Sequence, residues 1–170
     1  MALATSYYLL NSVILGGIPE SVTAARAFIR EALGENHPAV EIAMLLGSEL
    51  VSNAIRHSRS GRRDGGRLTV AVVVAAGVIH VDVIDEGSTD AIPEIPLQID
   101  ELSESGRGLW LVRELSSAWG WRDRATGRVV WFEVNGPDGA AVPDHSRSCQ
   151  SARAAGPVAG RYHQIRAGKD

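Results

Sequence analysis

The chain has very little of several residues on which whole classes of protein depend. Its one cysteine, Cys149, excludes an internal disulfide and a cysteine-rich metal site. Its five histidines occur singly and without the H-E-x-x-H spacing of helical zinc enzymes. Its one lysine, Lys169, lies outside any glycine-rich motif, so a P-loop nucleotide site with its phosphate-binding lysine is excluded.

Long apolar runs and a surplus of basic residues are also missing. No stretch approaches the roughly 18 unbroken apolar residues of a spanning helix, so we expect no membrane association. Because no basic segment precedes the first apolar stretch, we expect a cytoplasmic protein. The net charge is -3, made of -5 in residues 1–135 and +2 in the remainder. An acidic body argues against direct nucleic-acid binding.

The hydrophobic pattern that is present indicates one domain, residues 1–135, followed by a flexible C-terminal tail, residues 136–170. Runs of β-forming residues predict strands over 7–15, 68–75, 78–85, 119–124 and 128–134. Helical spacing of apolar residues predicts helices over 19–33, 38–57 and 106–117. This order predicts an α+β two-layer sandwich, with helices on one face of a mixed, mostly antiparallel sheet.

Residues 86–105 have no clear periodicity and are expected to form a lid, since a loop of about twenty residues is unusual inside a compact domain. The segment holds six carboxylates and no basic residue: Glu86, Asp90, Glu94, Asp100, Glu101 and Glu104. Because like charges near phosphate are disfavoured, we hypothesise that this acidic lid pairs with a basic surface. That surface belongs either to a partner or to the chain itself, at Arg56, Arg59, Arg62, Arg63 and Arg67.

The segment ELVSNAIRH places a carboxylate and an amide, Glu49 and Asn53, four residues apart on one face of the second predicted helix. The amide oxygen of Asn53 suits Mg²⁺, and Glu49 could accept a proton from a hydroxyl that attacks a γ-phosphate. A hydrogen-bonded pair on a solvated face is the alternative. The apolar residues around the two side chains argue against that alternative.

Two further segments carry candidate binding residues. Asp85 ends an apolar strand and Gly87 lets the backbone turn, so the carboxylate could accept a hydrogen bond from the exocyclic amine of adenine. Gly106, Arg107 and Gly108 open a helix, where backbone N–H groups and the helix dipole favour phosphate. Taken singly, the first segment is equally typical of a plain strand-to-turn signal and the second of a flexible hinge.

Taken together and in this order, the three segments resemble the nucleotide-binding fold shared by gyrase, heat-shock chaperone ATPases, histidine kinases and mismatch-repair ATPases. The resemblance covers about residues 10–134. In its short length, the chain resembles the anti-sigma-factor serine kinases of bacteria. The resemblance implies a Bergerat-type fold, with Glu49 as general base, Asn53 as magnesium ligand and Asp85 as the adenine-reading carboxylate. It implies ATP and Mg²⁺ as cofactors. After Gly87, Ser88 and Thr89 stand where the family commonly has a small or cyclic residue.

The function that the resemblance implies is an ATP-dependent serine kinase that also sequesters a sigma factor. Its other partners would be an anti-sigma-factor antagonist protein, as the substrate, and a second copy of the chain, as a homodimer. The first alternative is a protein-binding module that uses nucleotide only to set its shape, without phosphotransfer. A second alternative is an α+β dimerisation domain with no ligand.

Overall fold

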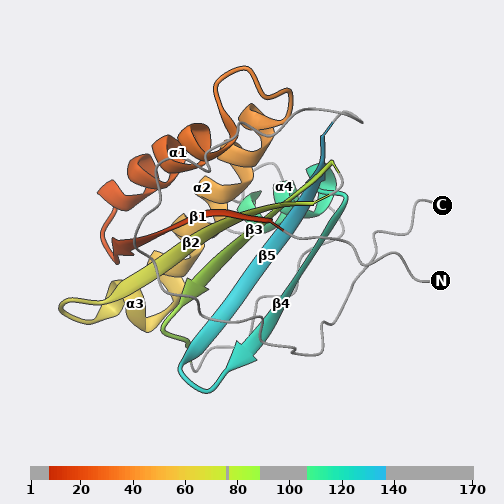
Figure 1. Ribbon diagram of the computed structural model, residues 1–170. Helices are drawn as coiled ribbons and strands as arrows, with labels where there is room; N and C mark the ends of the chain where they lie inside the picture. The colour runs from red at the N-terminus through yellow and green to blue at the C-terminus, as the bar shows by residue number, and fades with distance from the viewer. Residues whose placement is uncertain (1–7, 76, 89–106, 137–170) are drawn as a thin grey trace.

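The computed structural model describes residues 8–75, 77–88 and 107–136. The strands are β1 Tyr8–Gly16, β2 Arg67–Ala75, β3 Val78–Asp85, β4 Ala118–Arg124 and β5 Gly127–Asn135. The helices are α1 Glu20–Leu33, α2 Val40–His57, α3 Arg59–Arg62 and α4 Arg107–Leu115 (Figure 1). These bounds confirm the predicted strands and the three predicted helices. The short helix α3 lies in a segment for which the sequence indicated only a polar connection.

The five strands form one open sheet in the order β1-β2-β3-β5-β4. Every pairing among the described residues is antiparallel. The α+β sandwich is therefore confirmed, with an antiparallel sheet where the sequence led us to expect some parallel pairing. Strand β3 lies at the centre of this order, between β2 and β5. Its last residue, Asp85, pairs with Arg128 at the beginning of β5.

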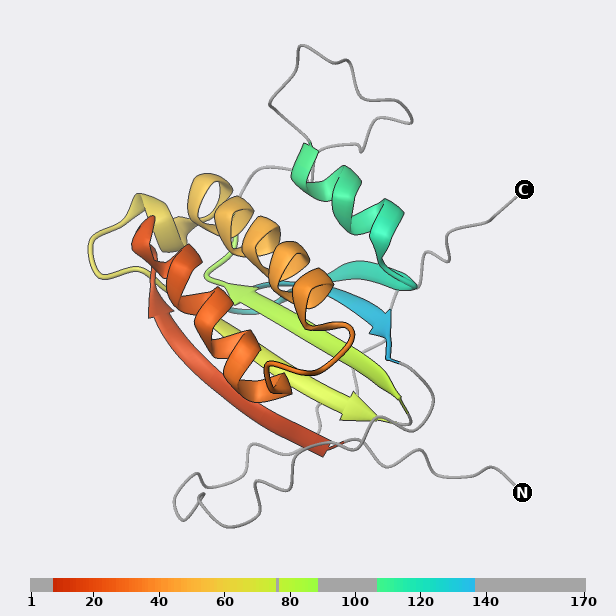
Figure 2. The ribbon, with the colours of Figure 1, turned by 90° about the horizontal axis from the view of Figure 1, so that it is seen from above.

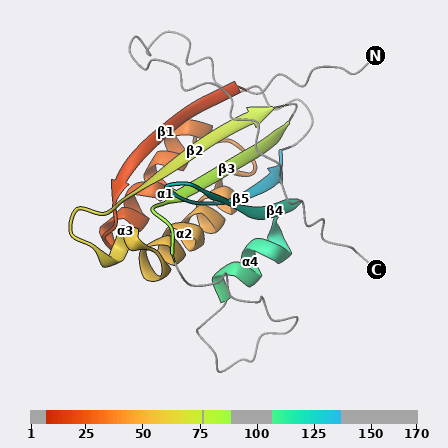
Figure 3. The same cartoon turned by 90° about the horizontal axis from the view of Figure 1, so that it is seen from below.

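Helices α1, α2 and α4 lie on one face of the sheet, and α4 lies beside α2 (Figures 2 and 3). Side chains alternate along a strand, so every second residue of β2 and β3 points to the helices and is buried. The helices meet them with apolar residues at helical spacing. The buried layer between helices and sheet includes Ile29, Leu46, Leu50, Val70, Val72, Val81 and Phe132.

The opposite face of the sheet carries a polar cluster centred on His80 of β3. Its Nε2 lies 3.1 Å from an oxygen of Asp82, and its Nδ1 lies 3.1 Å from an oxygen of Glu133. The ring also stacks on Trp131, with centroids 5.2 Å apart. Burial alone would lower the pKa of His80, but the hydrogen bonds and charges of the two carboxylates together raise it to about 9. The alternation of apolar and polar residues along β3 places these polar side chains on one face.

Two predicted features fall largely beyond the part of the chain that the structure describes. Residues 137–170 of the predicted tail and residues 89–105 of the predicted lid lie outside the described residues. Among the described helices, none has both the length and the apolar character needed to cross a membrane.

Candidate functional site

Asp85 is the one buried residue with an ionisable side chain in the part of the chain that the structure describes, and it lies on the helix-covered face of the sheet. It is the last residue of β3, and its place in the alternating pattern turns its side chain toward the helices. Only 8 % of the residue is exposed. Its Oδ1 accepts a hydrogen bond of 2.6 Å from the backbone N–H of Gly87. The chain thus turns around a buried carboxylate, as predicted for Asp85 and Gly87.

The surroundings of Asp85 leave its carboxyl group only partly stabilised as an anion. Burial raises its pKa, and the nearby charge of Asp123 adds to that effect. The backbone N–H groups of Gly87 and Arg128, together with the Arg128 charge, oppose it without cancelling it. A hydrogen-bond donor brought to this carboxylate by a ligand would therefore be favourable, because a buried polar group gains from each partner.

Two glycines allow the turn after Asp85 to pack against the beginning of β5. Gly87 has a φ of 82°, in the left-handed region that favours glycine. A Cβ atom built on Gly127 would overlap the backbone oxygen of Asp85. The sequence indicated Gly127 only as part of a hairpin turn, because its contact with Asp85 depends on strand pairing between distant segments.

Helix α2 presents Glu49 and Asn53 at neighbouring positions of one face, and both are half-buried. A Cβ atom built on Gly108 would overlap the Glu49 carboxylate and lie 3.4 Å from the Glu49 Cβ. The first turn of α4 therefore lies directly against Glu49, and the absence of a side chain at Gly108 makes this approach possible. The two segments therefore pack together in the fold.

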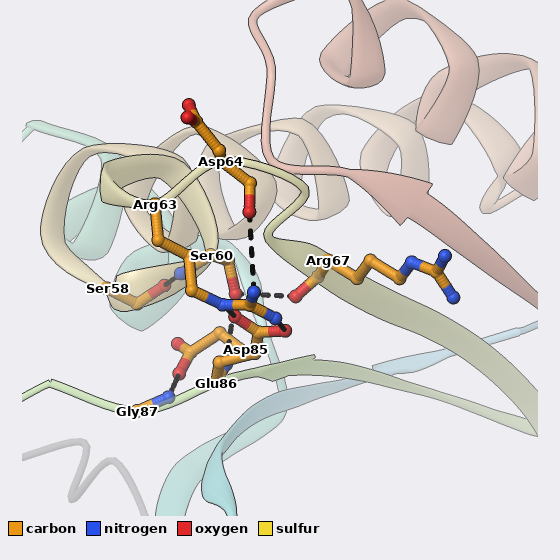
Figure 4. A network of polar contacts seen from close by, with 8 residues as sticks. All are labelled: Ser58, Ser60, Arg63, Asp64, Arg67, Asp85, Glu86 and Gly87. Carbon is orange, nitrogen blue, oxygen red and sulfur yellow. Dashed lines mark hydrogen bonds and ion pairs between the residues drawn. The ribbon is translucent and has the colours of Figure 1, made fainter.

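A network of hydrogen bonds joins the C-terminal end of α2 to the turn after Asp85 (Figure 4). Ser58 caps α3 by accepting a hydrogen bond of 3.1 Å from the N–H of Ser60. The hydroxyl of Ser60 accepts 2.9 Å from the N–H of Glu86 and donates 2.6 Å to the carbonyl of Arg67. The N–H of Arg59 donates 2.8 Å to the carbonyl of Gly87. The end of α2 is therefore fixed to the end of β3.

An ion pair reinforces this connection on its solvent side. Arg63 donates through Nε and Nη2 to the two oxygens of Glu86, at 2.7 and 2.6 Å (Figure 4). These hydrogen bonds lower the pKa of Glu86 and raise that of Arg63. One acid of the predicted lid thus pairs with the predicted arginine surface. The other five, Asp90, Glu94, Asp100, Glu101 and Glu104, lie outside the described residues.

Asn53 lies on α2 between the two places where that helix meets the other predicted segments. One turn before it, Glu49 contacts Gly108 of α4, and shortly after it, Arg59 binds the carbonyl of Gly87. The structure therefore places Glu49 against Gly108 and joins the segment after α2 to the turn of Gly87, with Asn53 on α2 between these two contacts. Arg107 is the exposed first residue of α4, and Gly106 lies outside the described residues.

The oxygen atoms of this region suit a metal ion only if phosphate and water supply its remaining ligands. Within residues 8–75, 77–88 and 107–136, no three His, Cys, Asp or Glu side chains are grouped so as to hold a metal. The oxygen donors of α2 are the Asn53 amide and the Glu49 carboxylate. Mg²⁺ commonly takes one or two protein oxygens and fills its octahedron with phosphate and water. These two residues suit that mode of binding. They do not suit a site in which the protein supplies every ligand.

Sequence reasoning did not assign a role to Ser58, Ser60 or Gly127, which hold the site together. A serine directly after a helix, followed by a second serine two residues on, is a recognisable capping signal for Ser58. The hydrogen bond of Ser60 to Glu86 and the packing of Gly127 against Asp85 join residues far apart in sequence, and local pattern gives no sign of them.

The comparison with protein families identifies the same region. A family model described as histidine kinase-like ATPase domain matches residues 18–134, well over half of the chain. No curated protein matched the chain. The matched residues include the whole of α1, α2 and α4, and all of the residues that surround Asp85 in the fold.

Proposed function

The chain belongs to the histidine kinase-like ATPase domain family, and from that premise we propose that it is an ATP-binding regulatory protein that phosphorylates a serine of a partner protein. Family membership implies ATP binding. The observation that carries the proposal is a hydrogen bond between the segment after α2 and the turn after Asp85: the N–H of Arg59 donates 2.8 Å to the carbonyl of Gly87. This hydrogen bond connects the turn of the buried carboxylate to the helix that carries Glu49 and Asn53.

Recognition of adenine would rest on Asp85. A buried carboxylate accepts hydrogen bonds only, so it suits the exocyclic amine of adenine and opposes the carbonyl that guanine has at that position. Its single turn donor, the N–H of Gly87, occupies Oδ1 at 2.6 Å. Selectivity for ATP over GTP would follow, because the wrong base would leave the buried group mispaired.

Phosphate chemistry would rest on α2 and the beginning of α4. Asn53 would contribute an amide oxygen to Mg²⁺, which neutralises charge on the phosphates when it is bound. Glu49 would accept the proton of the attacking serine hydroxyl. Its carboxylate lies beside Gly108 in the N-terminal turn of α4, where backbone N–H groups attract anions.

The proposed partners follow the resemblance to anti-sigma-factor serine kinases. We propose that the chain sequesters a sigma factor, phosphorylates the antagonist protein that would release it, and acts as a homodimer. The net charge of -5 in residues 1–135 is consistent with protein partners rather than direct nucleic-acid binding.

Phosphotransfer from labelled ATP to candidate antagonist proteins tests this proposal. We expect the parent to transfer phosphate in the presence of Mg²⁺ and the Glu49→Gln variant to lose at least about 100-fold in rate, since general bases contribute about 10² to 10⁴. ATP affinity of Glu49→Gln, measured by calorimetry, should stay within about twofold of the parent. Equal transfer rates in parent and variant would remove Glu49 from its role.

A specific observation favours a second function, a protein-binding module whose shape responds to nucleotide. The Ser58, Ser60 and Arg63 contacts connect an exposed surface to the turn after Asp85. If the parent binds ATP and transfers no phosphate to any candidate, this second function replaces the kinase.

A further inference from the structure

An arginine surface lies beside the proposed nucleotide site, on the last turn of α2, on α3 and at the beginning of β2. It consists of Arg56, Arg59, Arg62, Arg63 and Arg67, all of which are exposed. Residues 56–67 contain these five arginines and one acid, Asp64, which gives a charge of +4. The other described residues contain 7 arginines and 11 acids, which gives a charge of -4. The arginine surface is therefore a basic patch on an otherwise acidic part of the chain.

The backbone under this surface is held in place by its own contacts. The hydroxyl of Ser58 donates 2.7 Å to the carbonyl of Ala54, and that of Ser60 donates 2.6 Å to the carbonyl of Arg67. The N–H of Gly17 also donates 2.8 Å to the carbonyl of Gly66. A fixed backbone presents its charges at a lower entropic cost of binding than a mobile loop would.

The arginine surface is also physically connected to the site. Arg63 binds both oxygens of Glu86, and Glu86 is the residue after Asp85. The N–H of Glu86 binds Ser60 on α3. An anion that drew Arg63 away from Glu86 would therefore act on the turn that holds the Asp85 carboxylate. Figure 4 shows this path, with the Arg67 side chain directed away from Asp85.

We propose that the arginine surface is a docking surface for an acidic segment of a partner protein, and that the Arg63–Glu86 ion pair couples this docking to nucleotide affinity. The proposal rests on the proposed nucleotide site and goes beyond it by naming the surface and the chemistry of the partner. A protein segment fits better than nucleic acid or an anionic membrane. The charge of -4 on the other described residues would oppose an extended polyanion, whereas a short acidic segment contacts the patch alone.

Docking is tested with a labelled peptide of alternating glutamate and glycine as the probe, with a glutamine-for-glutamate peptide as its control. We expect Arg59→Gln with Arg67→Gln to weaken binding of the acidic peptide at least about fivefold at low salt. The matched variant, Arg30→Gln with Arg124→Gln, removes the same charge from exposed positions on α1 and β4 and should change binding less than about twofold. Equal losses in the two variants would overturn the proposal.

Coupling is tested by titrating ATP with and without saturating acidic peptide. In the parent, we expect the peptide to change ATP affinity at least about twofold, and ATP to change peptide affinity by the same factor. Glu86→Gln leaves Arg63 without its carboxylate, so the peptide should bind more tightly and the two ligands should become independent. Independence of the two ligands in the parent would overturn the coupling.

Other occupants of the surface would be recognised in the same assay. If duplex DNA or phosphatidylserine vesicles lost more affinity than the peptide in the Arg59→Gln, Arg67→Gln variant, the partner would not be an acidic protein. If changing Glu94, Asp100 and Glu101 to glutamine or asparagine strengthened peptide binding severalfold, the occupant would be the chain's own acidic segment. Either result would overturn the proposal. Peptide docking is read directly, so failure of ATP to bind the parent would count against the proposed function and not against docking.

Discussion

Strand β3 carries two aspartates three residues apart, and the fold treats them in opposite ways. Asp82 lies on the face without helices, where it binds His80 at 3.1 Å and lies 3.8 Å from Arg122. Asp85 lies on the helix-covered face, where its hydrogen bonds come from the backbone N–H groups of Gly87 and Arg128 and the Arg128 charge lies nearby. The carboxylate with cationic side chains around it is suited to holding the sheet together. The one held by a turn is suited to receiving a ligand.

The titration behaviour of the two regions follows the same division. Around Asp82, opposite charges raise the pKa of His80 to about 9, so the histidine is a cation at neutral pH. Around Asp85, burial raises the pKa of a carboxyl group whose nearest hydrogen bonds come from the backbone. A half-buried charge that is paired with side chains of opposite charge within the sheet is thus structural, and a buried carboxylate held mainly by backbone N–H groups is a candidate for binding.

The largest expected effect comes from filling the space beside the Asp85 turn. Gly127→Ala places a Cβ against the backbone oxygen of Asp85, so β5 or the turn must shift. We expect a loss of about 3 kcal/mol in the free energy of unfolding, measured by urea denaturation, since overpacking against backbone is poorly relieved.

Gly65→Ala is the matched control for this change. No atom lies within 4 Å of a Cβ built there, although its φ of 68° strains a side chain. Its cost should be only about 1 kcal/mol. Equal costs in the two variants would show that the packing of Gly127 against Asp85 does not stabilise the fold.

The next effect is a change of stability with pH, which arises on the face of β3 without helices. Because the folded-state pKa of His80 is raised from 6.5 to about 9, its stabilisation is complete below pH 6.5 and is lost as pH rises through about 9. We expect His80→Gln to be less stable than the parent by about 2 kcal/mol at pH 6, with the difference shrinking by pH 10. A difference that stays constant over this range would contradict the ion-pair role of His80.

The smallest effect on stability is expected at the contact between α4 and Glu49. The atom that a new Cβ at Gly108 would overlap is the mobile end of the Glu49 side chain, and alanine favours a helix. Gly108→Ala should therefore change the free energy of unfolding by less than about 1 kcal/mol while it displaces the Glu49 carboxylate. We expect the phosphotransfer rate of this variant to fall although its free energy of unfolding changes little. A variant that transfers phosphate at the parental rate would show that the contact between Gly108 and Glu49 is unimportant.

Much of the fold could be predicted from the sequence because its signals are local. The apolar spacing in α1 and α2 and the alternation in VIHVDVID each depend on residues within a few positions of one another. The antiparallel pairing of β1 with β2 and of β3 with β5 could not be predicted in the same way, because it depends on which strands become neighbours. The helix α3 was missed because its four residues carry no period of their own.

The candidate site was predictable where chemistry and spacing coincide and not where it depends on distant contacts. Glu49 and Asn53 are related by one helical turn, and Asp85 and Gly87 by one chain turn, so local reasoning found them. The closeness of Gly108 to Glu49 depends on the packing of α4 against α2, which the residues themselves do not indicate. Ser60 and Gly127 act only through segments brought together by the sheet, so no local pattern identified them.

The central claim is that Asp85, and not Asp82, reads adenine. Calorimetric titration of ATP and GTP into Asp85→Asn, Asp82→Asn and the parent, in the presence of Mg²⁺, tests it most directly. We predict that Asp85→Asn loses about 1 to 3 kcal/mol of ATP binding free energy and most of its preference over GTP. Asp82→Asn should bind ATP as the parent does. Equal ATP affinity in Asp85→Asn and the parent, or a greater loss in Asp82→Asn, would contradict the account.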